Sequence, residues 1–254
     1  MTASKRSILI INPNSTVSMT DGLRPLVQTL GFHDSTTYTF FTGPPAAPPS
    51  INNERDAADS TTHCFPALRP LLAAHDAFLV ACYSPHPLVA ALKAELAALD
   101  STKPVTGIFE ASVATALQAA VPPRGKFGIV STGKVWEGIL EGAVVEFLGL
   151  GSGGGGGGEG RFAGTETTGL MATELHEVEA GEVKRRMVEA TRRLVGRGDV
   201  GAVCLGCAGM AGMNEMVREA CMAELGEEEG KRVVIVDGVQ AGVAWLEGMM
   251  RIGV

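Results

Sequence analysis

Short apolar runs alternate with longer amphipathic runs along almost the whole chain, and this alternation is the strongest constraint on its fold. The first short run is SILIIN (Ser7 to Asn12), and others follow at TTYTFF, DAFLVAC, PVTGIF, KFGIVS, DVGAVCLGC and RVVIVD. The amphipathic segments between them have helical spacing. Strands that are apolar throughout are buried on both faces, so the pattern predicts an α/β fold with parallel sheets.

The same order of features occurs twice. In the first half one strand ends at Asn12-Pro13-Asn14 and a later strand ends at Cys82. In the second half the corresponding strands end at Ser131-Thr132 and at Cys207. We therefore expect two similar Rossmann-like lobes around a central cleft, residues 1–113 plus 239–254 and residues 114–238. The run GLGSGGGGGGEG at 149–160 cannot bury apolar surface and is expected to be a flexible loop.

Composition excludes several functional classes. The chain has 254 residues and a formal net charge of -7, without a block of basic residues, so nucleic acid is not an expected partner. The N-terminal segment has only four consecutive apolar residues, too few for a signal peptide, and no run is long enough to span a membrane. Five cysteines, an odd number, favour reduced thiols and a cytoplasmic location. Assembly into a homo-oligomer is left open.

The stretch VCLGCAGM, Val203 to Met210, contains two cysteines three positions apart. Because side chains alternate along a strand, Cys204 and Cys207 fall on opposite faces. No second Cys-x-x-Cys or histidine cluster completes a zinc site, and a redox pair needs both sulfurs at a helix start. Cys204 is interpreted as a buried core thiol, and Cys207 as a thiol at the end of a strand.

Cys82 occupies the equivalent strand end in the first half. Ligands of open α/β sheets bind at the carboxyl ends of the strands, so two facing halves would present one thiol on each side of a shared cleft. Backbone N–H groups after Cys207 are expected to favour its thiolate. The alternative is that the two cysteines are unrelated buried thiols.

Several motifs resemble one known group of proteins. They are INPNST after the first strand, ACYSPHPL around Cys82, GIFEA, FGIVST, ETTGL, LGCAGM around Cys207, and IVDGVQAGV near the end. In this combination the sequence is similar to the aspartate/glutamate/hydantoin racemase superfamily, and within it to the hydantoin and allantoin racemase branch of fungal type.

The resemblance implies a cofactor-independent racemase of a small cyclic ureide, with no metal and a small-molecule substrate as its partner. It implies that Cys82 and Cys207 are the catalytic acid and base, one on each face of the reacting carbon. Hydrogen-bond donors are then needed around the enolate oxygen. The expected substrate contacts are Asn14, Tyr83, Ser84, Ser131, Thr132, Ala208 and Gly209.

One motif departs from the bacterial hydantoin racemases, which tend to have Gly-Asp-Pro-Gly where this chain has YSPHP. His86 could contact substrate there, although a histidine at a helix start is more often structural. Two other functions stay open. One is an isomerase or decarboxylase of small dicarboxylates in the same superfamily, and the other is a ligand-binding member without catalytic activity.

Overall fold

The computed structural model describes residues 5–149 and 160–253. The chain divides into two compact units. The first extends to Ala111 and takes in the C-terminal segment from Val239, and the second is Ser112–Gly238. The expected flexible loop at 149–160 falls on residues 150–159, which lie outside the described residues.

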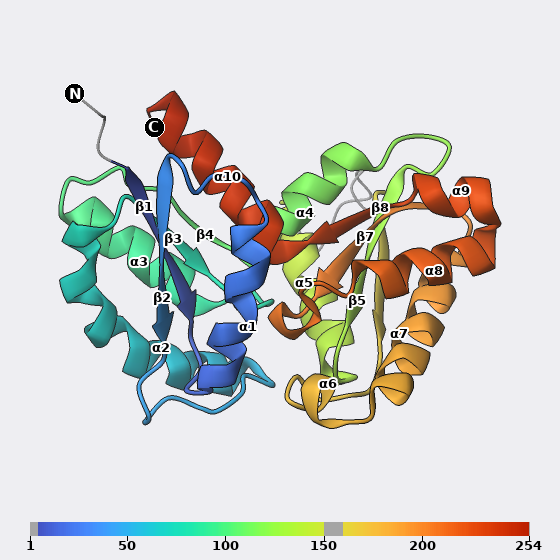
Figure 1. Ribbon diagram of the computed structural model, residues 1–254, viewed down its shortest axis with the longest axis horizontal. Helices are drawn as coiled ribbons and strands as arrows, with labels where there is room; N and C mark the ends of the chain where they lie inside the picture. Colours follow the sequence, from blue (N-terminus) through green and yellow to red (C-terminus); the bar gives the residue numbers. More distant parts are fainter. Residues whose placement is uncertain (1–4, 150–159, 254) are drawn as a thin grey trace. The chain divides into compact units, whose positions relative to one another are not determined.

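The first unit is built on a parallel sheet of four strands in the order β2-β1-β3-β4 (Figure 1). Its strands are β1 (Arg6–Asn12), β2 (Thr36–Thr42), β3 (Ala77–Val80) and β4 (Val105–Gly107). Its helices are α1 (Val17–Gln28), α2 (Glu54–Leu68), η1 (Arg69–Ala74), α3 (Pro87–Ala98), the start of α4 (Ile108–Ala119), and α10 (Gly238–Ile252), which begins at the last residue of the second unit.

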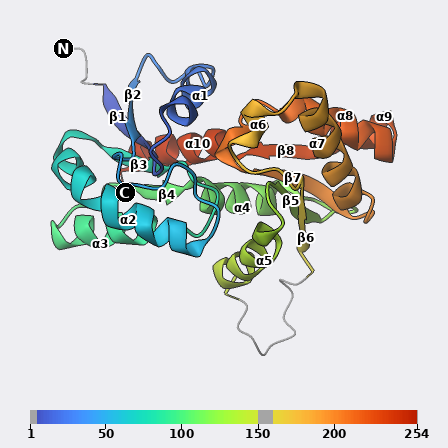
Figure 2. The same cartoon turned by 90° about the horizontal axis from the view of Figure 1, so that it is seen from below.

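Helices cover both faces of this sheet, as Figure 2 shows. On one face Leu9 and Phe78 pack in a buried cluster with residues of α2 and α3. On the other face α10 approaches so closely that a Cβ atom on Gly242 would lie 2.4 Å from Cδ1 of Leu79. Because side chains alternate between the two faces of a strand, they pack into two apolar layers, and helices cover both faces of the sheet.

The second unit repeats this plan with the strand order β6-β5-β7-β8, again all parallel. Its strands are β5 (Lys126–Ser131), β6 (Phe162–Thr167), β7 (Val200–Gly206) and β8 (Val234–Asp237). Its helices are the rest of α4, α5 (Val135–Phe147), α6 (Glu174–Glu177), α7 (Ala180–Val195), η2 (Ala208–Met210), α8 (Asn214–Leu225) and α9 (Glu227–Arg232).

The two faces of β7 enter different layers. Val203 and Leu205 pack in a buried cluster with residues of α7 and α8, and Cys207 contacts the same cluster. Cys204 points the other way, where its Sγ lies 3.7 Å from the carbonyl oxygen of Ser112 in α4. Cys204 is fully buried. The predicted opposite orientation of the two thiols along the strand is therefore observed.

Strand order makes the two units equivalent element by element. β1 corresponds to β5 and β3 corresponds to β7, because each pair holds the same position in its sheet. Cys82 follows β3 and Cys207 follows β7. The predicted α/β class, with two similar lobes built on parallel sheets, is confirmed by the observed topology.

Two local expectations differ from the structure. The apolar run PVTGIF was predicted as one strand, but β4 ends at Gly107 and α4 begins at Ile108. The strand β6 was not predicted, because its sequence FAGTET has no apolar run. Pairing with β5 recruits this segment into the sheet at its edge.

Candidate active site

The candidate site residues of the first unit lie at the carboxyl ends of β1 and β3. These strands are parallel neighbours, with Ile11 opposite Val80, and the N–H of Ala81 donates a hydrogen bond of 2.8 Å to the carbonyl oxygen of Ile11. The chain reaches Cys82 one residue later, beside the Asn12-Pro13-Asn14 turn that follows β1. Sheet pairing therefore brings together two motifs that are seventy residues apart in sequence (82 − 12).

Asn12 organises the turn after β1. Its Nδ2 group donates to Oδ1 of Asn14 at 2.9 Å, to Oγ1 of Thr20 at 3.0 Å and to the carbonyl oxygen of Thr16 at 3.1 Å. Asn12 is 2% exposed. Its amide thus ties the end of β1 to the first turn of α1 and positions the turn between them.

Asn14, a predicted substrate contact, is almost fully buried. Its Oδ1 accepts from Asn12 and also from the N–H of Thr16 at 2.9 Å. Its Nδ2 lies 3.1 Å from Sδ of Met19, and a thioether is a weak acceptor. The amide oxygen of Asn14 is therefore used by the protein, and its amide N–H groups hold the remaining capacity to donate to a ligand.

Cys82 is half-buried at the start of a tight turn. The N–H of Ser84 donates to the carbonyl oxygen of Cys82 at 3.1 Å, and the N–H of His86 donates to that of Ser84 at 2.8 Å. Oγ of Ser84 lies 3.6 Å from Sγ of Cys82. The turn thus places one hydroxyl group against the predicted catalytic thiol.

Tyr83, another predicted contact, is buried with its ring edge-on to Phe109, with ring centroids 5.7 Å apart. This packing fixes the ring beside the start of α4. Glu110, in the first turn of α4, was not among the predicted contacts. Its Oε2 is buried and has no hydrogen-bond partner among the described residues, and burial raises the pKa of this carboxyl.

His86 caps α3. Its Nδ1 accepts a hydrogen bond of 3.2 Å from the N–H of Leu88, while its Nε2 is buried with no hydrogen-bond partner in the described chain. Burial lowers the pKa of the imidazole to about 4, so the ring is neutral at neutral pH. An unpaired buried donor of this kind destabilises a fold by about 1–3 kcal/mol.

The candidate site residues of the second unit lie at the carboxyl ends of β5 and β7, where Ser131 pairs with Gly206. The buried hydroxyl of Ser131 donates 2.8 Å to the carbonyl oxygen of Gly206. The carbonyl oxygen of Thr132 accepts from the N–H of Gly169 at 2.9 Å. The hydroxyl proton of the predicted contact Ser131 is thus used in a hydrogen bond that joins the ends of β5 and β7. The carbonyl group of Thr132 anchors the loop after β6.

Cys207 caps the short helix η2. The N–H of Gly209 donates to its Sγ at 3.3 Å, and Ala208 and Gly209 are half-buried beside it. Burial raises the pKa of Cys207 to about 11, and the N–H groups of Gly209 and Met210 offset this only in part. The N–H groups of Gly209 and Met210 lower the pKa of Cys207, as expected, but the net pKa lies above the ordinary value in the ligand-free protein. The donors are present, but desolvation of the thiolate outweighs them.

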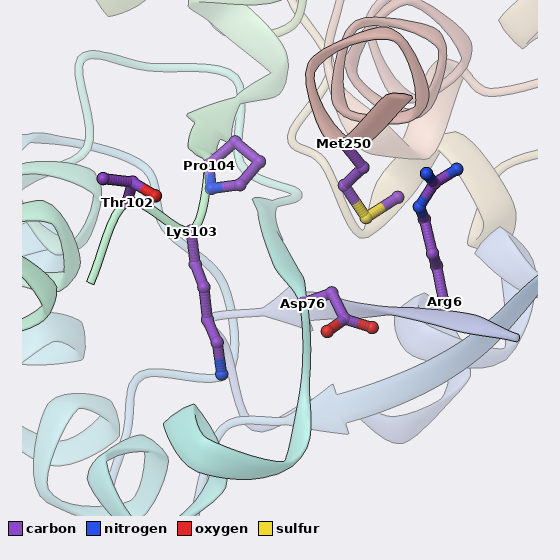
Figure 3. A pocket seen from close by; sticks show the side chains of 6 residues that line it. All are labelled: Arg6, Asp76, Thr102, Lys103, Pro104 and Met250. Atoms are coloured by element: carbon purple, nitrogen blue, oxygen red, sulfur yellow. The ribbon is translucent and has the colours of Figure 1, made fainter. Parts of the chain in front are cut away.

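In the first unit, a hollow of about 210 Å³ lies at the amino ends of the strands (Figure 3). It is lined by Arg6, Asp76, Thr102, Lys103, Pro104 and Met250, which come from the amino ends of β1, β3 and β4 and from α10. Asp76 accepts from the N–H of Ser7 at 2.8 Å, and Nζ of Lys103 donates to the carbonyl oxygen of Leu72 at 2.8 Å. The charged groups of this hollow hold the starts of the strands in place, at the opposite ends of the strands from Cys82.

Within residues 5–149 and 160–253, no three His, Cys, Asp or Glu side chains gather in a way that could hold a metal ion. In the same part of the chain, every helix is too short or too polar to cross a membrane.

Comparison with known proteins places these features in context. A family model described as Asp/Glu/Hydantoin racemase matches residues 8–246. An uncharacterized protein of Schizosaccharomyces pombe, C1F7.10, is 32% identical over 244 residues, covering 96% of this chain and 92% of the relative. A hydantoin racemase of Pseudomonas sp. is 28% identical over 248 residues, covering 97% and 86%. The solved structure of an allantoin racemase from Klebsiella pneumoniae is 25% identical, with a TM-score of 0.77 over 98% of this chain and 89% of the other.

Proposed function

Because the chain belongs to the Asp/Glu/hydantoin racemase family and is an isomerase of the racemase type, we propose that it racemises a small cyclic ureide. The substrate is allantoin or a 5-substituted hydantoin, and Cys82 and Cys207 carry the protons. The matched position of the two thiols carries the proposal, because Cys82 follows β3 by two residues and Cys207 follows the corresponding strand β7 by one. Relatives named as a hydantoin racemase and an allantoin racemase support the substrate class.

Inversion of a carbon beside a carbonyl group needs a base on one face and an acid on the other. The thiolate of one cysteine takes the proton from the carbon, and the electron pair moves onto the carbonyl oxygen as an enolate. The thiol of the second cysteine then donates its proton to the opposite face. The product leaves with the two protonation states exchanged, and the other enantiomer reacts by the reverse sequence. Only protons move, so the balance needs no oxidant or reductant.

Burial supports a starting role for one of the cysteines. Because the pKa of Cys207 is raised to about 11, this residue starts with its proton and is suited to be the acid. Cys82 then starts as the base for the same enantiomer, with Oγ of Ser84 3.6 Å from its sulfur to stabilise the charge. Asn14, Tyr83, Ser84, Ser131, Thr132, Ala208 and Gly209 remain the proposed substrate contacts.

The proposed compartment is the reducing cytosol. None of the five cysteines, all of which lie in the described residues, forms a disulfide. A mechanism with two thiols is compatible only with conditions in which both remain reduced.

The test follows the optical rotation of single enantiomers of allantoin and a hydantoin in D₂O, against a blank without protein. The wild-type protein should abolish the rotation and introduce deuterium at the reacting carbon. Cys82→Ser and Cys207→Ser should each abolish both changes, with Cys221→Ser, a cysteine on α8, as the control.

Three outcomes would contradict the proposal in different ways. Full activity in either site variant removes the two-thiol mechanism. Turnover of maleate or malonate, without turnover of any ureide, assigns the protein to the dicarboxylate isomerases or decarboxylases. Stabilisation by a ureide without turnover makes it a ligand-binding member of the family.

A further inference from the structure

The hydrogen bond between Leu88 and His86 determines which ring nitrogen of His86 carries the proton. A backbone N–H can only donate, so Nδ1, which accepts from Leu88 at 3.2 Å, must present its lone pair. In the neutral imidazole the proton is then on Nε2. His86 therefore presents an Nε2–H donor, and this donor is buried with no partner among the residues that the structure describes.

The hydrogen bond from Leu88 orients the imidazole ring of His86 at the start of α3. The two nitrogens point to opposite sides of the imidazole, and Nδ1 faces the first turn of α3. Nε2–H is therefore turned away from the first turn of α3, and His86 itself ends the turn that begins at Cys82. That turn follows β3 at the carboxyl edge of the sheet, where the proposed reaction takes place.

The backbone holds the ring rigidly. Pro85 and Pro87 flank His86, and each has a restricted φ. His86 itself has φ -74° and ψ 124°, the extended conformation required before a proline. The N–H of Val89 also donates to the carbonyl oxygen of His86 at 3.0 Å. A donor held in this way needs no reorganisation to meet a charge that develops during a reaction.

Capping alone does not account for a histidine at this position. A helix N-cap needs one acceptor, and asparagine, aspartate or serine supplies it without an additional buried donor. His86 is only 2% exposed, so its Nε2–H is desolvated and has no partner among the described residues. The additional feature is therefore a buried, neutral donor four residues after the predicted catalytic thiol, Cys82.

We propose that Nε2–H of His86 donates a hydrogen bond to the carbonyl oxygen beside the reacting carbon of the substrate, the oxygen that becomes the enolate. His86 is thus a substrate-contacting residue that stabilises the intermediate as a neutral donor. This inference rests on the proposed function for the identity of the ligand, a cyclic ureide, but its geometric basis is independent of the second cysteine.

Two substitutions of His86 distinguish the role of the Nε2–H donor from the role of Nδ1 in capping α3. Asparagine places its side-chain oxygen near the position of Nδ1, so His86→Asn keeps the cap acceptor and removes the donor at Nε2. Glutamine reaches the position of Nε2 with its amide N–H, so His86→Gln keeps a donor and loses the cap. We expect His86→Asn to lower kcat about 100-fold with little change in Tm. His86→Gln should retain kcat within about tenfold and have a lower Tm.

The second measurement uses dimethylhydantoin, whose reacting carbon carries two methyl groups and no hydrogen, so that it binds without reacting. The wild-type protein should bind it, and His86→Asn should bind it at least tenfold more weakly while His86→Gln does not. If the wild type binds this compound but racemises no ureide, the proposed function fails, and weaker binding by His86→Asn alone still supports the hydrogen bond from His86 to a bound ureide. Wild-type kcat or equal binding in His86→Asn, or no saturable binding by the wild type, would overturn the inference.

Discussion

The backbone N–H of Gly209 donates a hydrogen bond to Sγ of Cys207 across 3.3 Å. The sulfur therefore takes the place that an oxygen usually has when a side chain caps a helix start. Because the same sulfur is desolvated, the hydrogen bond holds the thiol in place without making it a thiolate in the ligand-free protein. Four predictions follow from this site and its counterpart in the first unit.

The raised pKa of Cys207 should make stability depend on pH in the alkaline range. An unfolded cysteine ionises at a pH of about 8.5, whereas Cys207 in the folded protein holds its proton up to about pH 11. Its stabilising contribution is therefore complete below pH 8.5 and is lost as the pH rises to 11. Denaturant unfolding at several pH values should show a flatter decline in the free energy of unfolding for Cys207→Ala than for the wild type.

Cys221 offers a matched control for this measurement, because burial also raises its pKa to about 11. Cys221→Ala should flatten the same pH dependence and leave racemisation intact. An unchanged pH dependence in Cys207→Ala would show that Cys207 ionises like an unfolded thiol.

Exchange of the Asn12 amide for a carboxylate should unfold the turn after β1. Asn12→Asp keeps the shape of the side chain but replaces the donor Nδ2 with a carboxylate oxygen. This oxygen would lie against Oδ1 of Asn14 and Oγ1 of Thr20, which accept hydrogen bonds from Asn12 in the native protein. The lost hydrogen bonds and the buried charge should lower the free energy of unfolding by about 3 kcal/mol or more. The corresponding substitution at an exposed position, Gln118→Glu, should change the free energy of unfolding by less than about 0.5 kcal/mol. Equal effects at the two positions would refute the role of Asn12.

A methyl group at Gly206 should disturb the segment that presents Cys207. A Cβ atom there would lie 2.7 Å from Cγ2 of Ile129 and 2.8 Å from the carbonyl oxygen of Val130. We expect Gly206→Ala to lower stability by about 1–3 kcal/mol and to reduce racemisation strongly. Gly138→Ala, on the exposed side of α5 with no atom within 4 Å, should stabilise the protein by about 0.5–1 kcal/mol. Normal activity in Gly206→Ala would show that this close packing does not position the thiol.

Removal of the hydroxyl group beside Cys82 should slow the reaction without unfolding the protein. Oγ of Ser84 lies 3.6 Å from Sγ of Cys82, and loss of one such interaction corresponds to about 1 kcal/mol, or roughly a fivefold to tenfold decrease in kcat. Steady-state kinetics of Ser84→Ala should show this decrease at an unchanged Tm. Ser101→Ala, after α3, serves as the control, and indistinguishable rates in the two variants would rule out assistance by the Ser84 hydroxyl.

The strands that were predicted correctly are those whose own residues are apolar. SILIIN and KFGIVS predict β1 and β5 because burial on both faces of a sheet requires continuous apolar side chains. FAGTET lacks this signal, and it becomes β6 because the edge of β5 offers unpaired backbone groups to it. At Ile108 the apolar run of a strand continues into a helix, and periodicity over so few residues does not separate the two.

Residue identity alone was enough to place Cys82 and Cys207 at strand ends and to assign the chain to an α/β class, because both follow from local alternation and from residue type. The pKa of Cys207 and the unpaired nitrogen of His86 could not be read in the same way. Both depend on how much water the surrounding fold removes from an atom and on which distant groups it supplies in return, and these quantities exist only once the chain is packed.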